Sequence, residues 1–442
     1  MTLDELRRAV AAEEIDTVVL ALTDMQGRLQ GKRFTAAHFL EAVLGHGAEA
    51  CNYLLAVDVE MNTVDGYAMS SWERGYGDFG MAPDLSTLRR TPWLPGTALL
   101  LADLEWHDHS PVVASPRQIL RRQIERLTER GWKALAATEL EFLLFRTSYR
   151  DAKLAGYRDL EPANLYNVDY SILGTSRVEP VLRRIRNEML GAGLVVENSK
   201  GECNLGQHEV NFLYDEVLAT ADKHAIYKNG AKEIADQEGM SISFMAKFNE
   251  REGSSCHVHL SLRDDAGRPV FADQPEVHDA FLAGQIATLS ELTLLHAPNV
   301  NSYKRFVAGS FAPTTIAWGA DNRTCAFRVL GEGSAKRIEC RLPGADVNPY
   351  LVLAALIAGG LHGIDAGLEL EPELAGNAYA SDHPRVPSTL RDARDLLAAS
   401  TVAHDAFGAD VVDHYLNYAR VELQAFDAAV TDWERERGFE RL

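Results

Sequence analysis

The sequence predicts an α+β protein with two domains. Its 442 residues are more than a single hydrophobic core of ordinary size accommodates. Apolar residues make up 46% of the chain and charged residues 24%, which is typical of a soluble globular protein. Short stretches with polar side chains on one face and apolar side chains on the other indicate strands. They lie between longer segments with helical periodicity and capping residues.

The first domain is expected to begin with a helix and to continue with strands. Residues 2–14 predict a short amphipathic helix, residues 16–22 a strand and residues 24–27 a turn. Residues 96–103 are apolar and predict another strand. The polar residues 105–110, rich in His and Asp, indicate a boundary. We therefore expect one domain over residues 1–106 and a second over residues 112–442.

The second domain is expected to open with a capped helix. Ser115 would cap this helix, Pro116 would occupy its first position, and Gln118 would reach back to complete a capping box. An Asn-Pro pair predicts the start of a later, buried helix in the same way. The further helices are predicted over residues 178–192, 224–238 and 350–361 and over much of the chain after residue 387.

Charge and cysteine content exclude several classes of protein. The net charge of −20 argues against a surface for nucleic-acid phosphates. Five scattered cysteines without a CxxC pair indicate a reduced, cytoplasmic protein. The first ten residues lack the apolar core of a signal peptide, and the longest apolar run, residues 350–361, is too short to span a bilayer. We therefore expect no nucleic-acid partner and no membrane association.

Four short segments place Glu, His and Arg side chains on one face of a predicted strand. Because alternate side chains of a strand share a face, Glu139 and Glu141 would point the same way, roughly 7 Å apart along the strand. Their neighbours are apolar, and buried carboxylates are costly unless they are paired or bind a metal. The other three segments are residues 202–209, residues 256–261 with His257, His259 and Ser261, and residues 336–342 with Arg337, Glu339 and Arg341.

The types of these side chains indicate the chemistry. Several carboxylates with one or two histidines, and no thiolate motif, favour Mg²⁺ or Mn²⁺ over structural Zn²⁺. Guanidinium groups suit carboxylate and phosphate oxygens, and Mg²⁺ with arginines is typical of phosphoryl transfer from ATP. The chain has no Walker loop and no GxGxxG, so a nucleotide would be held by side chains and sheet surface. The arginines interleaved with apolar residues are Arg305, Arg323, Arg328, Arg337 and Arg341.

In combination these segments resemble the glutamine synthetase family. Residues 301–305 resemble its NxYKR element, residues 322–328 its NR-x4-R element, and residues 337–341 its RxExR element. Residues 202–209 resemble E…GQxE, and residues 83–87 resemble PDxST. The resemblance implies a small N-terminal β-grasp domain and a larger catalytic domain with a curved antiparallel sheet flanked by helices. It also implies a homo-oligomer, a dodecamer of two stacked hexameric rings with active sites between adjacent subunits.

The resemblance also implies roles for individual residues. The cofactors would be ATP and two or three Mg²⁺ or Mn²⁺ ions, with glutamate as a substrate that is first phosphorylated on its γ-carboxylate. One metal would be held by Glu141, Glu202 and Glu209 and the second by Glu139, His257 and Glu339. Arg305 and Arg341 would bind glutamate, with the Gly253 backbone near its amino group. Arg323 would stabilise the transferring phosphoryl group, and His259, Ser261, Arg328 and Arg337 would contact ATP.

Two departures from the family pattern concern the nitrogen nucleophile. Where glutamine synthetases carry a GYE-type triplet whose glutamate receives a proton from ammonium, this chain has Phe311 at the third position. In the loop before His257, Glu252 replaces an asparagine. Our interpretation is that a larger primary amine enters beside Phe311, with Glu252 as the base or as the group that holds the amine as a cation. An exposed loop acid without a role is the alternative for Glu252. The pattern resembles the γ-glutamyl-amine ligase branch, with ethanolamine as the first expected substrate and a polyamine as the next.

Two other functions remain open at this point. One is an ordinary ammonium-using glutamine synthetase with a displaced base. The other is a catalytically silent relative that serves as a structural assembly. The second is disfavoured because a silent scaffold has no physical need for six buried metal-ligand side chains.

Overall fold

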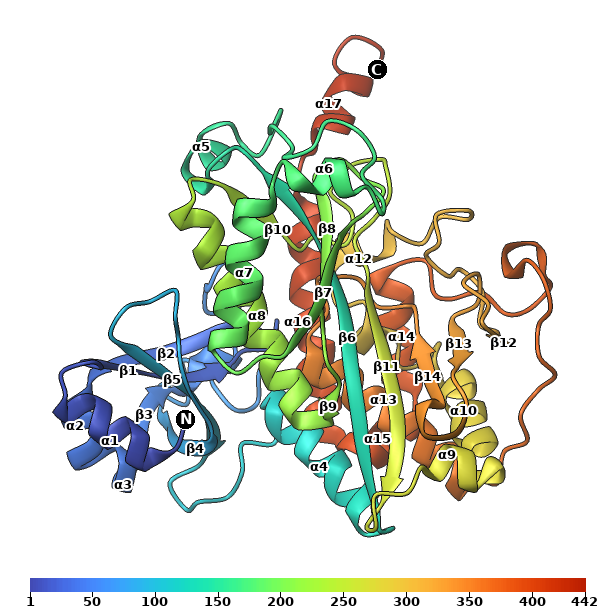
Figure 1. The fold of residues 1–442 in the computed structure, drawn as a ribbon. Coiled ribbons are helices and arrows are strands. Elements are labelled where there is room, and N and C mark those ends of the chain that lie inside the picture. Colours follow the sequence, from blue (N-terminus) through green and yellow to red (C-terminus); the bar gives the residue numbers. More distant parts are fainter.

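The computed structural model describes residues 1–442 and contains two β-sheets with their own helices (Figure 1). The smaller sheet lies in the N-terminal part, beside the larger one, and has the strand order β2-β1-β5-β4-β3. Strands β1 and β2 form an antiparallel hairpin, whereas β1 and β5 are parallel. The strands are β1 (Thr17–Thr23), β2 (Leu29–Thr35), β3 (Ala48–Cys51), β4 (Asp78–Arg90) and β5 (Thr97–Glu105).

Strand β5 shows why this sheet is buried on both faces. Its alternate residues Ala98, Leu100 and Leu104 pack into an N-terminal core with the first helix. The intervening Leu99 and Leu101 belong instead to the large core of the rest of the chain. Since successive side chains of a strand point to opposite faces, one strand joins the two cores. The apolar run over residues 96–103 is therefore a strand, as predicted.

The larger sheet has nine strands and carries the segments with alternating charged residues. Its order is β12-β13-β14-β11-β6-β8-β7, with β9 and β10 both paired to β6. The pairs are antiparallel except β12 with β13, which is parallel. The strands are β6 (Trp132–Phe145), β7 (Val196–Gly201), β8 (Gln207–Phe212), β9 (Asp215–Glu216), β10 (Ser241–Ser243), β11 (Cys256–Asp264), β12 (Trp318–Ala320), β13 (Phe327–Leu330) and β14 (Arg337–Cys340).

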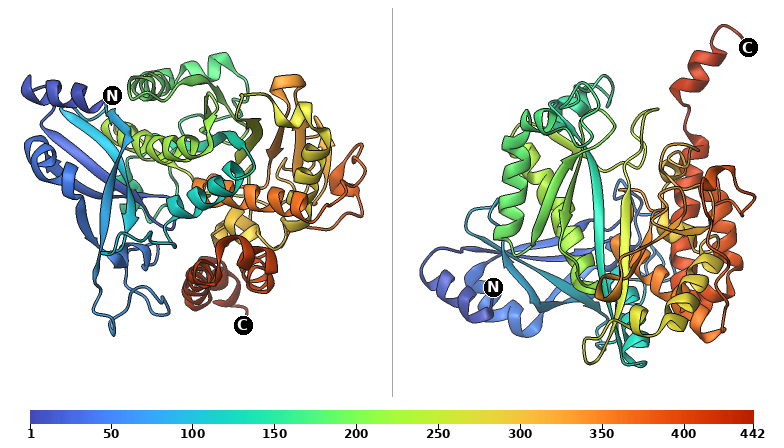
Figure 2. Two further views of the ribbon diagram at one scale, coloured as in Figure 1. Left: turned by 90° about the horizontal axis from the view of Figure 1, so that it is seen from below. Right: turned by 45° about the vertical axis from the view of Figure 1, so that its right-hand side comes forward.

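Helices cover this sheet and pack closely against one another (Figures 1 and 2). Helices α10 (Pro275–Thr288) and α13 (Pro349–Asp365) approach so closely that a Cβ added at Gly363 would lie 2.0 Å from the Ala280 carbonyl oxygen. Only glycine fits there. The longer helices are α1 (Leu3–Ala11), α4 (Pro116–Thr128), α5 (Tyr149–Leu154), α6 (Ile172–Ser176), α7 (Glu179–Gly191), α8 (Val217–Gln237), α10 (Pro275–Thr288), α13 (Pro349–Asp365), α14 (Leu390–Ala399), α15 (Thr401–Phe407), α16 (Ala409–Ala428) and α17 (Asp432–Gly438). The short ones are α2 (Ala36–His38), α3 (Leu44–His46), α9 (Val270–Asp273), α11 (Thr293–His296) and α12 (Val300–Tyr303).

The helices α7, α13 and α14–α17 lie where the sequence predicts helix, and Asn348 caps α13 by accepting from the Tyr350 N–H. Helix α8 begins seven residues earlier than expected, at Val217. Helix α17 projects away from the body of the molecule (Figure 2). None of the helices combines the length and apolar character needed to cross a membrane.

The predicted capping box of α4 is wrong. Pro116 does occupy the first turn, but the Ser115 side chain makes no capping hydrogen bond. The first turn is held instead by Arg117, whose guanidinium pairs with Asp84 and Asp103 of the smaller sheet and with Asp222 of α8. These long-range ion pairs position the start of the helix without a local cap. They also connect the parts of the chain over residues 1–106 and 112–442, which we propose as the two domains.

Candidate active site

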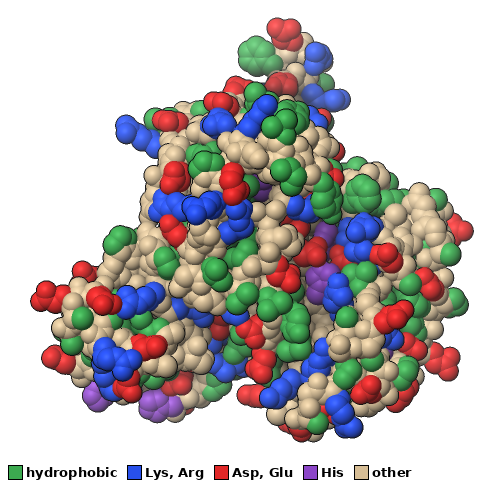
Figure 3. All heavy atoms as spheres, in the orientation of Figure 1, with side chains coloured by type: hydrophobic (Ala, Val, Ile, Leu, Met, Phe, Trp, Pro, Cys, Tyr) green, Lys and Arg blue, Asp and Glu red, His purple; other side chains and the backbone are tan.

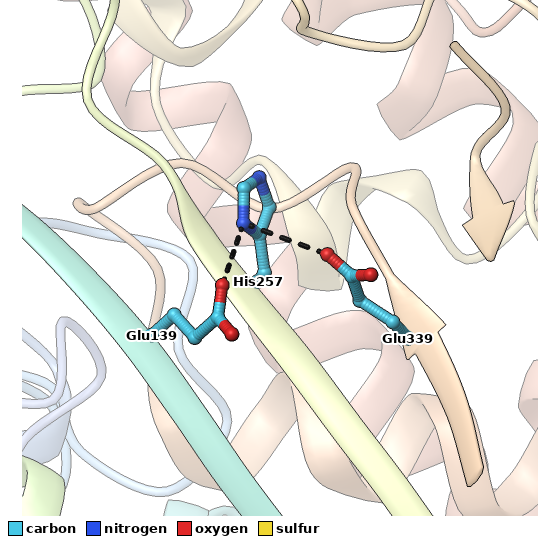
Figure 4. A group of neighbouring side chains, drawn as sticks. All are labelled: Glu139, His257 and Glu339. Carbon is cyan, nitrogen blue, oxygen red and sulfur yellow. Dashed lines mark hydrogen bonds and ion pairs between the residues drawn. The ribbon is translucent and has the colours of Figure 1, made fainter. Parts of the chain in front are cut away.

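Three neighbouring strands bring the first group of predicted ligands together. In the antiparallel register, Glu139 of β6 lies opposite His257 of β11, and Glu339 of β14 lies opposite His259. His257 Nδ1 is 3.2 Å from a Glu139 oxygen and 3.7 Å from a Glu339 oxygen (Figure 4). One ligand atom from each of the three residues lies within 4.8 Å of the others. Glu139, His257 and Glu339 thus form one compact group.

A second group of carboxylates lies where β6 pairs with its other neighbour, β8. Glu141 pairs with Glu209 of β8 in the strand register, and Glu202 follows directly after β7. Their ligand atoms also lie within 4.8 Å of one another. Burial and the nearby Glu141 carboxylate raise the pKa of Glu202 to about 8, and burial with the neighbouring glutamates raises the pKa of Glu209 well above its usual value. Because Glu139 and Glu141 are alternate residues of β6, both groups lie on the same face of this strand.

The donor set of these two groups fits divalent cations. The three carboxylates of the second group, Glu141, Glu202 and Glu209, repel one another unless a cation lies between them. Within this group the one ion pair joins Lys200 to Glu202. Oxygen donors with a single imidazole suit Mg²⁺ or Mn²⁺. When bound, such ions would polarise phosphoryl and carbonyl oxygens. Assignment of the six side chains as metal ligands is a proposal that this donor set supports.

Hydrogen bonds on both ring nitrogens fix the orientation of His259 beside the first group. His259 Nε2 lies 2.9 Å from a Glu139 oxygen, while its Nδ1 accepts a hydrogen bond from the Nε of Arg337 at 3.2 Å. With Nδ1 accepting from Arg337, the Nε2 atom is the one that donates to Glu139. Burial raises the pKa of Glu139, but hydrogen bonds with His257 and His259 lower it below its usual value overall. Glu139 is consequently a carboxylate at neutral pH.

Two adjoining cavities contain nearly all the remaining predicted residues. The larger cavity, about 640 Å³, is lined by Glu252, Gly253, Arg305, Phe311, Arg323, Arg328 and Arg341 together with most of the carboxylates. The smaller, about 420 Å³, is lined by His259, Ser261 and Arg337. Glu139, Asn198 and Asn211 line both. Of the four residues expected at ATP, three therefore lie in the smaller cavity and Arg328 in the larger one. Figure 3 shows histidine and acidic side chains within a hollow of the molecular surface.

The arginines of the larger cavity are fixed by the protein itself. Arg305 is 3% exposed and donates to the carbonyls of Leu342 and Arg341 at 2.8 and 3.2 Å. Arg341 and Arg328 both donate to Glu339, at 2.5 and 3.0 Å. A buried carboxylate thus orients two guanidinium groups. A cavity with arginines preorganised in this way is suited to anionic substrates.

The Glu252–Gly253 loop and Phe311 form the remaining wall. A Cβ at Gly253 would lie 2.6 Å from the Ala246 carbonyl oxygen and 2.8 Å from the Arg305 side chain, so only glycine allows this approach. Phe311 is 61% exposed and has φ = +59°, a conformation that is unfavourable for a bulky side chain. A strained aromatic residue thus lies at the opening of the cavity.

Sequence reasoning missed several residues that position or line the site. Glu141 accepts hydrogen bonds from Gln207 at 2.9 Å and from the Ser255 backbone at 2.8 Å. Gln207 belongs to the GQxE segment, and this motif could have identified it as a site residue. No motif in the sequence marks Ser255. Asp169, Tyr170, Lys200 and Cys203 also line the larger cavity. Asp169 and Tyr170 lie in a loop without a motif, so only the fold reveals them.

Comparison with known proteins agrees with this fold and site. Residues 113–438 match the family described as "Glutamine synthetase, catalytic domain". The chain belongs to the glutamine synthetase family of carbon–nitrogen ligases. The predicted α+β fold class is confirmed by a solved structure described as "GmaS/ADP complex-Conformation 1", with a TM-score of 0.86, 27% identity, and coverage of 98% of this chain and 99% of that one.

Three curated relatives align over nearly their full length. The chain is 64% identical over 442 residues to Gamma-glutamylethanolamide synthetase GlnA4 of Streptomyces coelicolor, covering 99% of this chain and 96% of that protein. It is 38% identical to Glutamate--isopropylamine ligase of a Pseudomonas species, covering 98% and 97%. Glutamine synthetase of Thermus thermophilus is 31% identical, covering 98% of each chain.

Proposed function

We propose that the protein is an ATP-dependent ligase that joins the γ-carboxylate of glutamate to a primary amine, with ethanolamine the favoured amine and a polyamine the next. The observation that carries the proposal is Phe311 at the cavity opening, with no carboxylate in the segment Gly309-Ser310-Phe311. The 64% identity to a γ-glutamylethanolamide synthetase supports the choice of amine.

The reaction has two steps. An oxygen of the glutamate γ-carboxylate attacks the terminal phosphorus of ATP, giving γ-glutamyl phosphate and ADP. The amine nitrogen then attacks the acyl carbon, phosphate leaves, and the nitrogen loses a proton. Arg305 and Arg341 bind glutamate, and Arg323 stabilises charge on the phosphoryl group. His259, Ser261 and Arg337 hold the nucleotide in the smaller cavity, with Arg328 in the adjoining larger one.

Glu252 is the proposed acceptor of the amine proton. One of its oxygens is shielded from solvent and has no hydrogen-bond partner within the chain, although the side chain as a whole is 43% exposed. The one ion pair of this oxygen is a long one, 3.9 Å to the exposed Arg251 guanidinium, and it contributes little. A carboxylate oxygen free within the cavity can hold an ammonium ion or receive its proton.

The proposal extends to the assembly. We infer a dodecamer of two stacked rings in the cytoplasm, with active sites completed across subunit boundaries. The family membership supports this assembly, and sedimentation of the purified protein tests it.

The decisive experiment measures phosphate release from ATP with Mg²⁺ and glutamate. Ammonium, ethanolamine, putrescine and spermine are compared, and product masses are determined in parallel. Turnover with an organic amine and little with ammonium supports the ligase, whereas efficient turnover with ammonium identifies a glutamine synthetase. Glu252→Ala should lower amine-dependent turnover about 100-fold. Glu250→Ala, an exposed acid of the same loop outside the cavity, is the matched control.

A further inference from the structure

Besides its arginines, the larger cavity is lined by one lysine, which lies among the acidic groups. The Lys200 ammonium, from β7, is paired with Glu202 and lies 3.3 Å from an Asp169 oxygen. It also lies 4.2 Å from the centre of the Tyr170 ring, within the range of a cation–π interaction. Three groups thus fix a primary ammonium whose side chain is 22% exposed.

The segment that carries this ammonium is linked to the segment of Glu252, the proposed acceptor of the amine proton. Glu202 and Cys203 lead directly to Asn204, whose amide donates to the Glu252 carbonyl at 2.7 Å and to Asn249 at 2.9 Å. The segment carrying Glu252 is therefore bonded to the segment next to Lys200. Lys200, Glu252 and Phe311 all line the same cavity.

We propose that Lys200 determines amine specificity by excluding amines that carry a second positive charge, which favours ethanolamine over the polyamine named as the next candidate. This inference rests on the proposed function. A diamine that presents one nitrogen to the acyl carbon would place its other ammonium in a cavity that already holds a fixed cation. At an effective dielectric constant of about 20, two unpaired unit charges about 7 Å apart repel enough to weaken binding roughly 50-fold. The carboxylates of Glu202 and Asp169 offset part of the Lys200 charge, so the expected effect is smaller, about tenfold.

The neighbouring groups strengthen this selection. Asp169, the carboxylate best placed to bind a second ammonium, is already occupied by Lys200 on one oxygen and lies 3.6 Å from the Cys203 sulfur on the other. Tyr170, whose ring lies against the Lys200 ammonium, has φ = +53°, an uncommon backbone conformation for an aromatic residue. A neutral hydroxyl at the far end of an amine can exchange hydrogen bonds with Asp169 and Lys200 without a charge penalty. Discrimination here arises from a repulsive element built against the wrong substrate.

The test compares two amines with the same number of heavy atoms, 3-aminopropan-1-ol and 1,3-diaminopropane, with ethanolamine as the reference. The kcat and KM of each are measured at saturating ATP, glutamate and Mg²⁺. We expect wild type to favour the amino alcohol. Lys200→Met should raise relative kcat/KM for the diamine at least about tenfold, mainly through KM, and Lys200→Gln should do the same. Lys200→Arg keeps the charge and should keep the wild-type selectivity.

The outcomes separate this inference from the function on which it rests. Ligation of ethanolamine by wild type, with a selectivity ratio unchanged in both neutral variants, overturns the role of Lys200 alone. Loss of selectivity in Lys200→Arg overturns it as well. Absence of product with every amine overturns the ligase itself. Calorimetric titration of each variant with Mg²⁺ shows whether a change in metal affinity, rather than in amine recognition, accounts for a kinetic difference.

Discussion

Removing Arg117 should destabilise the contact between the two sheets more than any surface ion pair can. Arg117 is 3% exposed and contacts three carboxylates, with distances of 2.6 Å to Asp84, 2.5 Å to Asp103 and 3.0 Å to Asp222. In Arg117→Met, Arg121 still reaches Asp84 and Asp103, at 3.0 and 2.9 Å. Asp222, 4% exposed, would keep only the Tyr350 hydroxyl at 2.7 Å.

The expected loss is about 3–5 kcal/mol, because a buried carboxylate remains without its cation. Urea unfolding followed by tryptophan fluorescence measures it. Arg121→Met is the matched control, because this side chain is one turn further along the same helix, pairs with two of the same carboxylates and is 32% exposed. It should lose only about 0–1 kcal/mol.

The double variant Arg117→Met/Asp222→Asn tests the cause. Removing the orphaned charge should recover about half or more of the stability lost in Arg117→Met. Equal destabilisation by Arg117→Met and Arg121→Met would refute the reasoning, as would a double variant no more stable than Arg117→Met.

Three further predictions concern the site and the stability of the chain. Phe311→Glu places a carboxylate at the cavity opening and should raise ammonium-dependent turnover at least about tenfold. An assay with ammonium as the sole nitrogen donor measures the product. Unchanged ammonium-dependent turnover would show that Phe311 has no part in the choice of nucleophile. Glu209→Gln removes one of three converging carboxylates and should abolish turnover and reduce, but not remove, the rise in melting temperature that Mg²⁺ causes relative to EDTA, because the Glu139–His257–Glu339 group remains intact. A Mg²⁺-dependent rise equal to that of wild type would exclude Glu209 as a ligand. Burial lowers the pKa of His296 and of His414 to about 4, so each stays neutral in the folded protein while the unfolded chain takes up a proton below about pH 6.5. Stability should therefore be full above pH 6.5 and fall as the pH drops towards 4, by about 2 kcal/mol for each histidine at pH 5. Urea unfolding at pH 7 and pH 5 measures this, and His296→Leu should show a smaller difference than wild type, whereas an equal difference would contradict the assignment.

Local periodicity explains which aspects of the site could be predicted. Glu139 with Glu141, and His257 with His259, alternate with apolar residues, and this pattern is sufficient to assign strands and a shared face. The side-chain types were sufficient to indicate carboxylate-bound cations and phosphate chemistry. The family motifs then implied which residues act together.

Predictions from local sequence were wrong where contacts with distant residues, rather than a neighbouring side chain, position a helix. Ser115 has the sequence features of a capping residue, but Arg117 and its three distant carboxylates position the helix instead. The early start of α8 at Val217 likewise has no signal in its own residues.

What the sequence by itself determined is therefore the type of many elements and the face on which their polar residues lie, while the chemistry of those residues stays a prediction. The segment 202–209 was only partly a strand, because β8 begins at Gln207. Only the tertiary structure decided which strands are neighbours, and so that ligand atoms of Glu139, His257 and Glu339 lie within 4.8 Å of one another. It also decided that Lys200 lies between Asp169 and Glu202 in the cavity. The physical reason is that strand pairing and buried ion pairs depend on how the whole chain packs, and no local pattern of residues encodes that packing.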